Sequence, residues 1–341
     1  MVAVAEAAKV SIFTVSAVIN GTSVVSDELR LRVEAAIRTT GYKRNAVARS
    51  LKTGRTQTVG VVIGDITNPF YTDVVAAVQQ VLYRAGYGVM LCCNDRNVTL
   101  QRDHIAVLHD RMVDGLIIAP TGDDEQLRTA LEQTHLPVVL IDRILDGLEC
   151  DAVVIDNRSA VIGAMRYLLS LGHRRIGFVA GMFESFTGRE RLAGYHAALG
   201  ENGVDYEPDL VQLGNFRIDD AYNATLRLMM LPNPPTAVFS SNNLMVIGVM
   251  KALAHLGLRC PDDVSVAGLD DFPWADAFRP QLTAVAQPTR AIGEQAANLL
   301  LDRLNGSASG KGRRTVLDAV LRVRESCRPI SAAERAARPG Q

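Results

Sequence analysis

The stretch SIFTVSAVINGTSVVS, residues 11–26, holds one short helix and the turn that ends it, and it decides the fold of the N-terminal part of the chain. Ser11 can cap a helix that runs to about Ile19, and Asn20-Gly21 can end it. Between Ser11 and Ile19 there is no Arg, Lys, Asn or Gln, the side chains that most often hydrogen-bond to DNA bases. If this helix binds DNA, apolar and hydroxyl side chains must make the contacts.

Two further helices are predicted, one on either side of this stretch. The segment 2–9 (VAVAEAAK) consists of strong helix formers. Ser26, which is followed by two acidic residues, can start a third helix that Gly41 stops. Three short helices, the first two joined by a tight turn, predict an all-α helix-turn-helix DNA-binding domain over residues 1–43. The alternative is a helical cap with no role in DNA binding.

The charges of the chain are unevenly distributed, and this favours the DNA-binding alternative. Residues 1–58 contain nine Lys and Arg against four Asp and Glu, a net charge of +5, whereas the whole chain carries −1. The rest of the chain therefore carries −6. A basic N-terminal module on an acidic body indicates contact with a polyanion at one end only.

A hinge and linker are expected at residues 44–58. NAVARSL (45–51) has the composition of a short helix that Asn45 can cap, and KTGRTQT (52–58) has that of a linker. Seven residues cannot hold a helix in water unaided, because nucleation costs too much free energy. We therefore expect 45–51 to be ordered only when something packs against it.

From Val59 onward, short runs rich in β-branched residues alternate with amphipathic segments. Nearly continuous apolar strands separated by helices predict parallel sheets that are covered on both faces. About 270 residues with this pattern are enough for two sheets. We therefore expect an α/β domain with two doubly wound parallel sheets over 59–330, followed by a tail at 331–341. The expected strands lie at 58–64, 87–93, 114–120, 136–142, 174–181, 235–241 and 263–270.

Polar and aromatic residues follow the predicted strands, at the edge where open α/β sheets bind ligands. Planar hydrogen-bonding groups combined with aromatic rings suit a sugar, which has hydroxyl groups and apolar C–H faces. Taken singly, Asp65, Asp156 and Asp270 are explained equally well as helix N-caps, whereas for Phe70 and Tyr71 packing in the core is the less favoured alternative. Together, the residues predict a small-molecule effector site between two lobes. Its candidate residues are Asp65, Asn68, Phe70, Tyr71, Asp142, Arg143, Asp156, Arg191, Phe216, Asn242, Asp270 and Gln287.

Nothing in the sequence predicts an enzyme. GSASGK (306–311) is one residue too short for a phosphate-binding loop, and GxGxxG, HExxH and GxSxG motifs are absent. The five cysteines lack metal-ligand spacing and the six histidines do not cluster, so we expect neither a cofactor nor a metal. Since there is no signal peptide and no apolar run of about 20 residues, we expect a cytoplasmic protein without a membrane partner.

The order of these parts and several motifs resemble the LacI-type (lactose repressor) family of bacterial transcription regulators over essentially the whole chain. VAEAAKVSIFTVSAVIN (4–20) is similar to the family's signature V-A-x-x-A-G-V-S-x-x-T-V-S-x-x-[IL]-N, and residues 24–56 resemble its third helix and hinge. In the body, DITNPFY, RMVDGLII, HRRIGFVAG, RLAGY and PDDVSVAGLDD stand at the expected points. The resemblance implies a helix-turn-helix domain joined to a periplasmic-binding-protein-like effector domain.

The resemblance also implies a homodimer that places two recognition helices, here 11–19, in the major grooves of a near-palindromic operator DNA. In such proteins a hinge helix, here 46–51, pairs with its dimer mate in the minor groove, and a Leu at the position of Leu51 wedges between base pairs. The residues then expected to contact DNA are Ser11, Ile12, Phe13, Thr14, Ser16, Ala17, Asn20, Asn45, Ala48 and Leu51.

Within the recognition helix, the hydroxyl residues are expected to cap the helix or contact phosphates. Ile12, Phe13 and Ala17 occupy the positions where relatives carry base-contacting side chains, so we expect these three residues to face outward. Apolar side chains contact chiefly the methyl groups of thymine. For Phe13, packing in the core is the alternative.

For the effector domain, the resemblance implies one lobe at about 59–157 and 288–315 and another at about 158–287 and 316–330. The candidate cleft residues fall where ribose-type binders hold their sugar, which favours a pentose-like effector. Two departures from the family pattern stand out: Lys9 replaces a usual Gly, and Asn243 replaces a common Asp. A sugar-binding protein without a DNA-binding role and a regulator that responds to a nucleobase remain alternatives.

Overall fold

The structure is a computed structural model of the 341-residue chain, and it describes residues 1–21, 23–42, 54–122 and 125–331. The chain divides into two compact units, Met1–Thr56 and Gln57–Gln341. The hinge helix predicted at 45–51 and the tail at 332–341 lie outside the described residues.

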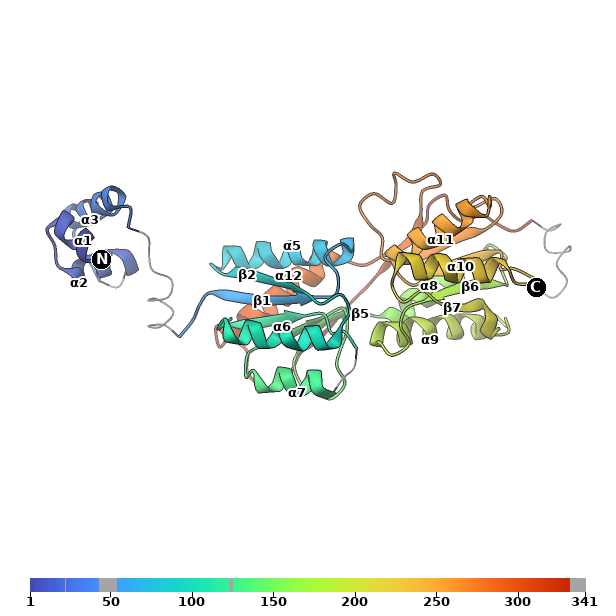
Figure 1. The fold of residues 1–341 in the computed structure, drawn as a ribbon, viewed down its shortest axis with the longest axis horizontal. Coiled ribbons are helices and arrows are strands. Elements are labelled where there is room, and N and C mark those ends of the chain that lie inside the picture. The colour runs from blue at the N-terminus through green and yellow to red at the C-terminus, as the bar shows by residue number, and fades with distance from the viewer. Residues whose placement is uncertain (22, 43–53, 123–124, 332–341) are drawn as a thin grey trace. The chain divides into compact units, whose positions relative to one another are not determined.

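The N-terminal unit contains the three predicted helices, α1 (Val2–Ala8), α2 (Ile12–Asn20) and α3 (Asp27–Thr40) (Figure 1). Gly21 and Gly41 end α2 and α3 in the left-handed conformation, with φ of 62° and 60°, which glycine adopts without strain. A small apolar core joins the helices, with Val4, Val15 and Val33 completely buried at its centre.

In the second unit, one sheet has the strand order β11-β5-β4-β3-β1-β2, and all its strands are parallel. Helices α5 (Pro69–Arg84) and α12 (Thr289–Leu304) pack on one face, and α6 (Val98–Asp110) and α7 (Glu125–Gln133) on the other (Figure 1). The strands are β1 (Thr58–Ile63), β2 (Gly88–Cys93), β3 (Gly115–Ile118), β4 (Val138–Ile141), β5 (Asp151–Ile155) and β11 (Arg314–Leu317).

The other sheet has the order β12-β10-β9-β8-β6-β7, and only β12 runs antiparallel to its neighbour. Helices α8 (Asn157–Ser170) and α9 (Phe186–Glu201) cover one face, and α10 (Ile218–Met229) and α11 (Asn243–His255) the other. A 3₁₀ turn, η1 (Pro208–Leu210), precedes β7. The strands are β6 (Ile176–Ala180), β7 (Val211–Leu213), β8 (Ala237–Ser240), β9 (Ser265–Leu269), β10 (Thr283–Ala286) and β12 (Val320–Arg322).

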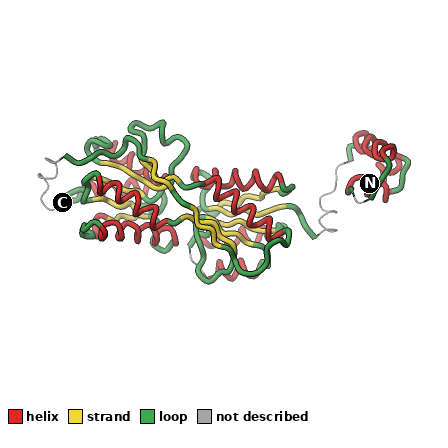
Figure 2. Tube along the Cα trace, turned by 180° about the vertical axis from the view of Figure 1, so that it is seen from behind, coloured by secondary structure: helices red, strands yellow, loops and turns green. Residues whose placement is uncertain are grey.

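These two sheets confirm the predicted fold class, and they define two lobes. The described chain passes between the sheets after β5, after β10 and between β11 and β12 (Figure 2). We call the part built on the first sheet lobe 1 (57–156 and 288–317) and the part built on the second sheet lobe 2 (157–287 and 318–331). Because the strands are parallel, the loops after their carboxyl ends gather at one edge of each sheet.

In the described part of the chain, no single helix is long and apolar enough to cross a membrane. The pair Val2–Ala8 and Ile12–Ile19, bent by 101°, passes the same test of length and composition only when its two helices are taken together. Buried residues of the core in the N-terminal unit belong to both of these helices.

Candidate effector site and nucleic-acid interface

The start of helix α2 is fixed by its own side chains. The Ser11 hydroxyl accepts a hydrogen bond from the Thr14 amide at 3.0 Å and lies 2.9 Å from the Thr14 hydroxyl. Ser11 therefore caps the helix, as the sequence predicts. Before it, Lys9 takes the left-handed conformation with φ of 49° at the end of α1. Arg32 donates to the carbonyl oxygens of Ala8 and Lys9 at 2.7 and 3.2 Å, which satisfies this helix end.

The two apolar residues in the first turn of α2 face outward. Phe13 is 75% exposed and Ile12 is 47% exposed, so Phe13 is not a core residue. Val15 is completely buried and anchors the opposite face of the helix. The prediction for Ala17 is wrong: it is only 3% exposed, although it lies one helical turn after the exposed Phe13. A buried methyl group cannot contact a DNA groove.

Of the other residues predicted to bind DNA, the structure describes the side chains of only three. Ser11 and Thr14 are engaged with each other at the helix start, and Ser16 is half-buried. The side chain of Asn20 lies outside the described residues. So do Asn45, Ala48 and Leu51 of the predicted hinge helix.

In the second unit, the loops after the strands enclose a cleft between the two lobes. The free space at its centre is about 20 Å³, which is room for a single water molecule. Because the lining side chains nearly fill it, a larger molecule enters only if they move apart. The lining residues are Asn68, Phe70, Tyr71, Arg96, Asp142, Arg143, Thr187, Arg191, Phe216, Asn242 and Asp270.

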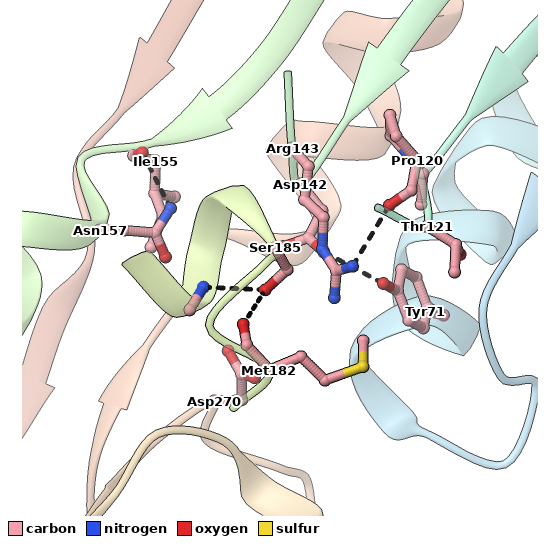
Figure 3. A network of polar contacts seen from close by, with 12 residues as sticks. Tyr71, Pro120, Thr121, Asp142, Arg143, Ile155, Asn157, Met182, Ser185 and Asp270 are labelled. Carbon is pink, nitrogen blue, oxygen red and sulfur yellow. Dashed lines mark hydrogen bonds and ion pairs between the residues drawn. The ribbon is translucent and has the colours of Figure 1, made fainter. Parts of the chain in front are cut away.

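On the lobe 1 side, the end of strand β4 supplies a carboxylate and a guanidinium. The Tyr71 hydroxyl donates to Asp142 Oδ2 at 3.0 Å, and Arg143 donates to the Pro120 carbonyl at 3.2 Å. Figure 3 shows the guanidinium of Arg143 between Pro120 and Tyr71. Arg143 Nε also lies 3.2 Å from Asp142 Oδ2, in a direction that makes an ion pair but no hydrogen bond. The two opposite charges are therefore held together at the cleft wall.

On the lobe 2 side, Arg191 is the centre of a buried network. It donates to Asn157 Oδ1 at 2.7 Å and to the Ser241 carbonyl at 2.6 Å, and it lies 3.9 Å from Asp270 Oδ2. Gln287 donates to the other oxygen of Asp270. Arg191 and Asp270 are 3% and 6% exposed, so each charge is paired inside the protein rather than by water.

Burial dominates the ionisation of two groups in the cleft. It raises the pKa of Asp270 to about 6, although Arg191 and the hydrogen bond from Gln287 both lower it. Burial, followed by the neighbouring charge of Asp142, also raises the pKa of Tyr71 above its ordinary value. The Tyr71 phenol therefore remains a hydrogen-bond donor at neutral pH.

The structure brings together most of the predicted effector residues, but not three of them. Asp65 accepts hydrogen bonds from Thr67 and pairs with Arg96, behind the cleft wall. Asp156 is exposed and caps helix α8, so it is the helix N-cap that the sequence allowed as an alternative. Gln287 does not line the cleft but holds Asp270 from behind.

Two lining residues were missed by the sequence analysis, Arg96 and Thr187. Arg96 follows Asn94 by two residues, so the end of strand β2 was a signal for it. Thr187 lies in the first turn of α9, and nothing in its sequence surroundings marks it. Its hydroxyl is buried and, among the described residues, has no hydrogen-bond partner.

Other buried polar atoms in or next to the cleft also lack a hydrogen-bond partner among the residues that the structure describes. They are Arg143 Nε, which is ion-paired with Asp142, and the atoms Ser241 Oγ and Gln287 Oε1 of two residues outside the cleft lining. Buried polar groups are normally hydrogen-bonded, so such a cluster indicates a place where a polar ligand completes the bonding. The donors and acceptors here suit a small molecule with several hydroxyl or carbonyl groups.

Comparison with known proteins agrees with both units. Residues 1–45 match the family described as bacterial regulatory proteins, lacI family, and residues 165–327 match the periplasmic binding protein-like domain. The HTH-type transcriptional repressor PurR of Vibrio campbellii is 36% identical over 302 residues, which is 88% of this chain and 90% of the relative. The chain belongs to the LacI family of bacterial regulatory proteins. Its relatives are transcriptional regulators, not enzymes.

Solved structures of this family show the same fold. A lac repressor dimer bound to operator and the anti-inducer ONPF is 28% identical, with a TM-score of 0.85, and the match covers 95% of this chain and 98% of that one. A LacI family regulator from Enterococcus faecium with bound ribose is also 28% identical, with a TM-score of 0.72 over 80% of this chain and all of that one.

Proposed function

We propose that this LacI-family protein is a transcriptional repressor that binds a near-palindromic operator as a homodimer, and that a pentose-sized sugar in the cleft changes its affinity for the operator. Residues 1–43 are the DNA-binding domain, 44–58 the hinge and 59–330 the effector-binding domain. The cleft residues carry the effector part of the proposal, and helix α2 carries the DNA part.

The composition of the cleft supports a neutral, polyhydroxylated effector. Two carboxylates, Asp142 and Asp270, stand beside the guanidinium groups of Arg143 and Arg191. Each carboxylate accepts and each guanidinium donates, so sugar hydroxyls, which do both, can bond to all four groups. Phe216 adds a flat apolar surface for a C–H face.

A purine base is the second candidate. The observation that favours it is the similarity to repressors named PurR, of which the one from Vibrio campbellii is 36% identical. A purine would use Phe216 and Tyr71 for stacking, but it needs few acceptors. The two buried carboxylates of the cleft are better matched to the several hydroxyl donors of a sugar.

A ligand panel tests the effector part. Thermal unfolding of the full chain is followed with D-ribose, D-xylose, D-glucose, ribitol, hypoxanthine and guanine, and hits are quantified by calorimetry. Ligand that binds the folded state raises Tm, and we expect the largest rise with D-ribose and none for the Asp270→Ala variant. A larger rise with hypoxanthine or guanine than with any sugar would replace the pentose by a purine.

A further inference from the structure

We propose that Asn243 is a positioning residue for the effector: it fixes the orientation of the Asn68 amide and ties the two lobes together across the cleft. The inference rests on the proposed function, because it concerns the same cleft. Asn68 lines the cleft from lobe 1, whereas Asn243 starts helix α11 in lobe 2 and does not line it.

The bond between these two residues is direct and buried. Asn243 Nδ2 donates to Asn68 Oδ1 at 3.0 Å, and the two residues are 1% and 4% exposed. A hydrogen bond inside the protein, away from competing water, holds its geometry better than one at the surface. This bond between Asn243 and Asn68, which we call the latch, therefore joins the two lobes and can form only while they are closed.

Backbone amides determine which way each side-chain amide points. The Leu244 amide donates to Asn243 Oδ1 at 2.7 Å, which places the oxygen of Asn243 there and turns its nitrogen toward lobe 1. The Phe70 amide donates to Asn68 Oδ1 at 3.0 Å, so this oxygen receives two donors. Since both oxygens are assigned by N–H groups that can only donate, neither side chain can be flipped without losing these bonds.

The consequence for the effector is a donor of fixed position. With its oxygen occupied by Phe70 and Asn243, Asn68 offers only its Nδ2 to the cleft, and the group opposite must accept a hydrogen bond. A sugar hydroxyl or ring oxygen satisfies this condition. The Phe70 amide orients Asn68 within lobe 1, and the bond from Asn243 holds that orientation when the lobes close. Asn243 thereby couples lobe closure to effector affinity without touching the effector.

The test uses the full chain with D-ribose as the probe and calorimetric affinity as one readout. Asn243→Asp keeps the shape and the acceptor for Leu244 but removes the donor, and it should weaken D-ribose binding about tenfold at pH 8. Position 243 is buried, and burial raises the pKa of an introduced carboxyl group, so part of the Asp is protonated at pH 5.5 and can donate again. The ratio of its affinity to that of the wild type should therefore rise. Asn243→Ala should show no recovery. Titration of Asp270 affects all variants and cancels in the ratio.

Asn97→Asp is the matched control, because Asn97 is an exposed N-cap that only accepts, and Asp does the same. It should bind D-ribose as the wild type does. The positioning role is wrong if Asn243→Asp binds as tightly as the wild type at pH 8, or if Asn243→Asp and Asn243→Ala are equally weak at both pH values, since that indicates a structural role only.

Residue-resolved hydrogen exchange of the ligand-free protein tests the role of Asn243 independently of whether D-ribose is the effector. In Asn243→Asp at pH 8, the Phe70 amide should exchange faster than in the wild type, whereas the Leu244 amide should stay protected because Asp still accepts from it. In Asn243→Ala both amides should exchange faster. If the wild type fails to bind D-ribose, this measurement still tests whether Asn243 holds the Asn68 amide in place. Unchanged exchange of the Phe70 amide in Asn243→Asp would show that it does not.

Discussion

The guanidinium carbon of Arg143 in lobe 1 lies 5.4 Å from the centre of the Phe216 ring in lobe 2. A cation thus covers an aromatic face across the cleft, an arrangement that is favourable when both groups are buried. Phe216 has φ of 58°, and its ring lies against Gly181, which leaves room for it by having no side chain. A sugar that stacks on this ring must take the place of the guanidinium, so ligand entry and the contact between the lobes are directly linked.

Gly181→Ala should abolish or strongly weaken effector binding while the protein stays folded. A Cβ at this position would come within 2.0 Å of Phe216 Cζ, so the ring must leave its place. We expect D-ribose affinity to fall at least tenfold by calorimetry. Gly163→Ala in helix α8 is the control, because a Cβ there meets nothing within 4 Å and affinity should be unchanged. Equal affinity in all three proteins would show that the ring position is irrelevant.

D-ribose binding should weaken as the pH falls through about 6. Burial raises the pKa of Asp270 to about 6, and the ionised carboxylate accepts stronger hydrogen bonds from hydroxyl groups than the neutral acid does. Calorimetry between pH 5 and 8 measures this change. Asp270→Asn should bind weakly over the whole range, with a flat profile. A wild-type affinity that stays constant from pH 8 to 5 would contradict the role of the carboxylate.

The same carboxyl group makes the ligand-free protein less stable as the pH rises. Between its unperturbed value of 3.8 and about 6, the folded state binds more protons at Asp270 than the unfolded state does, so stability falls with increasing pH in this window. Asp270→Asn removes this contribution. The difference in free energy of unfolding between wild type and variant should therefore change between pH 4 and 7, as denaturant titrations can show. A constant difference would mean that Asp270 titrates normally.

Asp151 should stabilise the effector-binding domain, and its contribution should disappear in acid. Its side chain is completely buried and accepts hydrogen bonds from Arg303 and Arg313. Burial raises its pKa, but these bonds outweigh burial and bring the pKa to about 2. The stabilisation is present above about pH 4 and is lost as the pH falls toward 2. Asp151→Asn should cost about 2 kcal/mol at pH 7.

The control for Asp151 is Asp302, which pairs with Arg313 at the surface and is 48% exposed. Asp302→Asn should cost less than about 1 kcal/mol, because solvent screens exposed pairs. Urea unfolding at pH 7 and pH 3 compares the two variants. Similar losses for both variants, or a loss at Asp151 that is as large at pH 3 as at pH 7, would contradict this account.

Phe13→Ala should change the sequence preference of DNA binding but not the stability of the N-terminal unit. Phe13 is 75% exposed, so truncating it removes little buried surface. If its ring contacts a thymine methyl group, replacing that thymine by uracil should weaken wild-type binding several-fold and leave the variant unaffected. Leu31→Ala, which truncates an exposed apolar residue of α3, is the control. Loss of stability without a change in preference would mean that Phe13 is a packing residue.

The sequence was sufficient to predict the fold and most of the cleft. Alternating apolar strands and helices indicate two largely parallel sheets, and residues such as Asn68 and Asp142 follow from their places after the carboxyl ends of strands β1 and β4. From the sequence alone, Asp156 could be either a helix N-cap or an effector-binding residue, because both kinds of residue directly follow a strand. Thr187 and the bond between Asn68 and Asn243 depend on how two distant loops meet, which no local pattern contains. The prediction for Ala17 was wrong because helical spacing places it on the same side as Phe13, whereas its small side chain is covered by neighbouring residues.

The most direct test of the account is a fluorescence anisotropy titration of an operator duplex, obtained by selection from random DNA, with the full chain in the presence and absence of D-ribose. We predict that binding falls steeply with salt concentration and that D-ribose changes the Kd of the wild type about tenfold or more. The Asp270→Ala variant should bind the same duplex with a Kd that D-ribose does not change. A wild-type Kd that is identical with and without D-ribose would contradict the claim that a pentose in this cleft controls DNA binding.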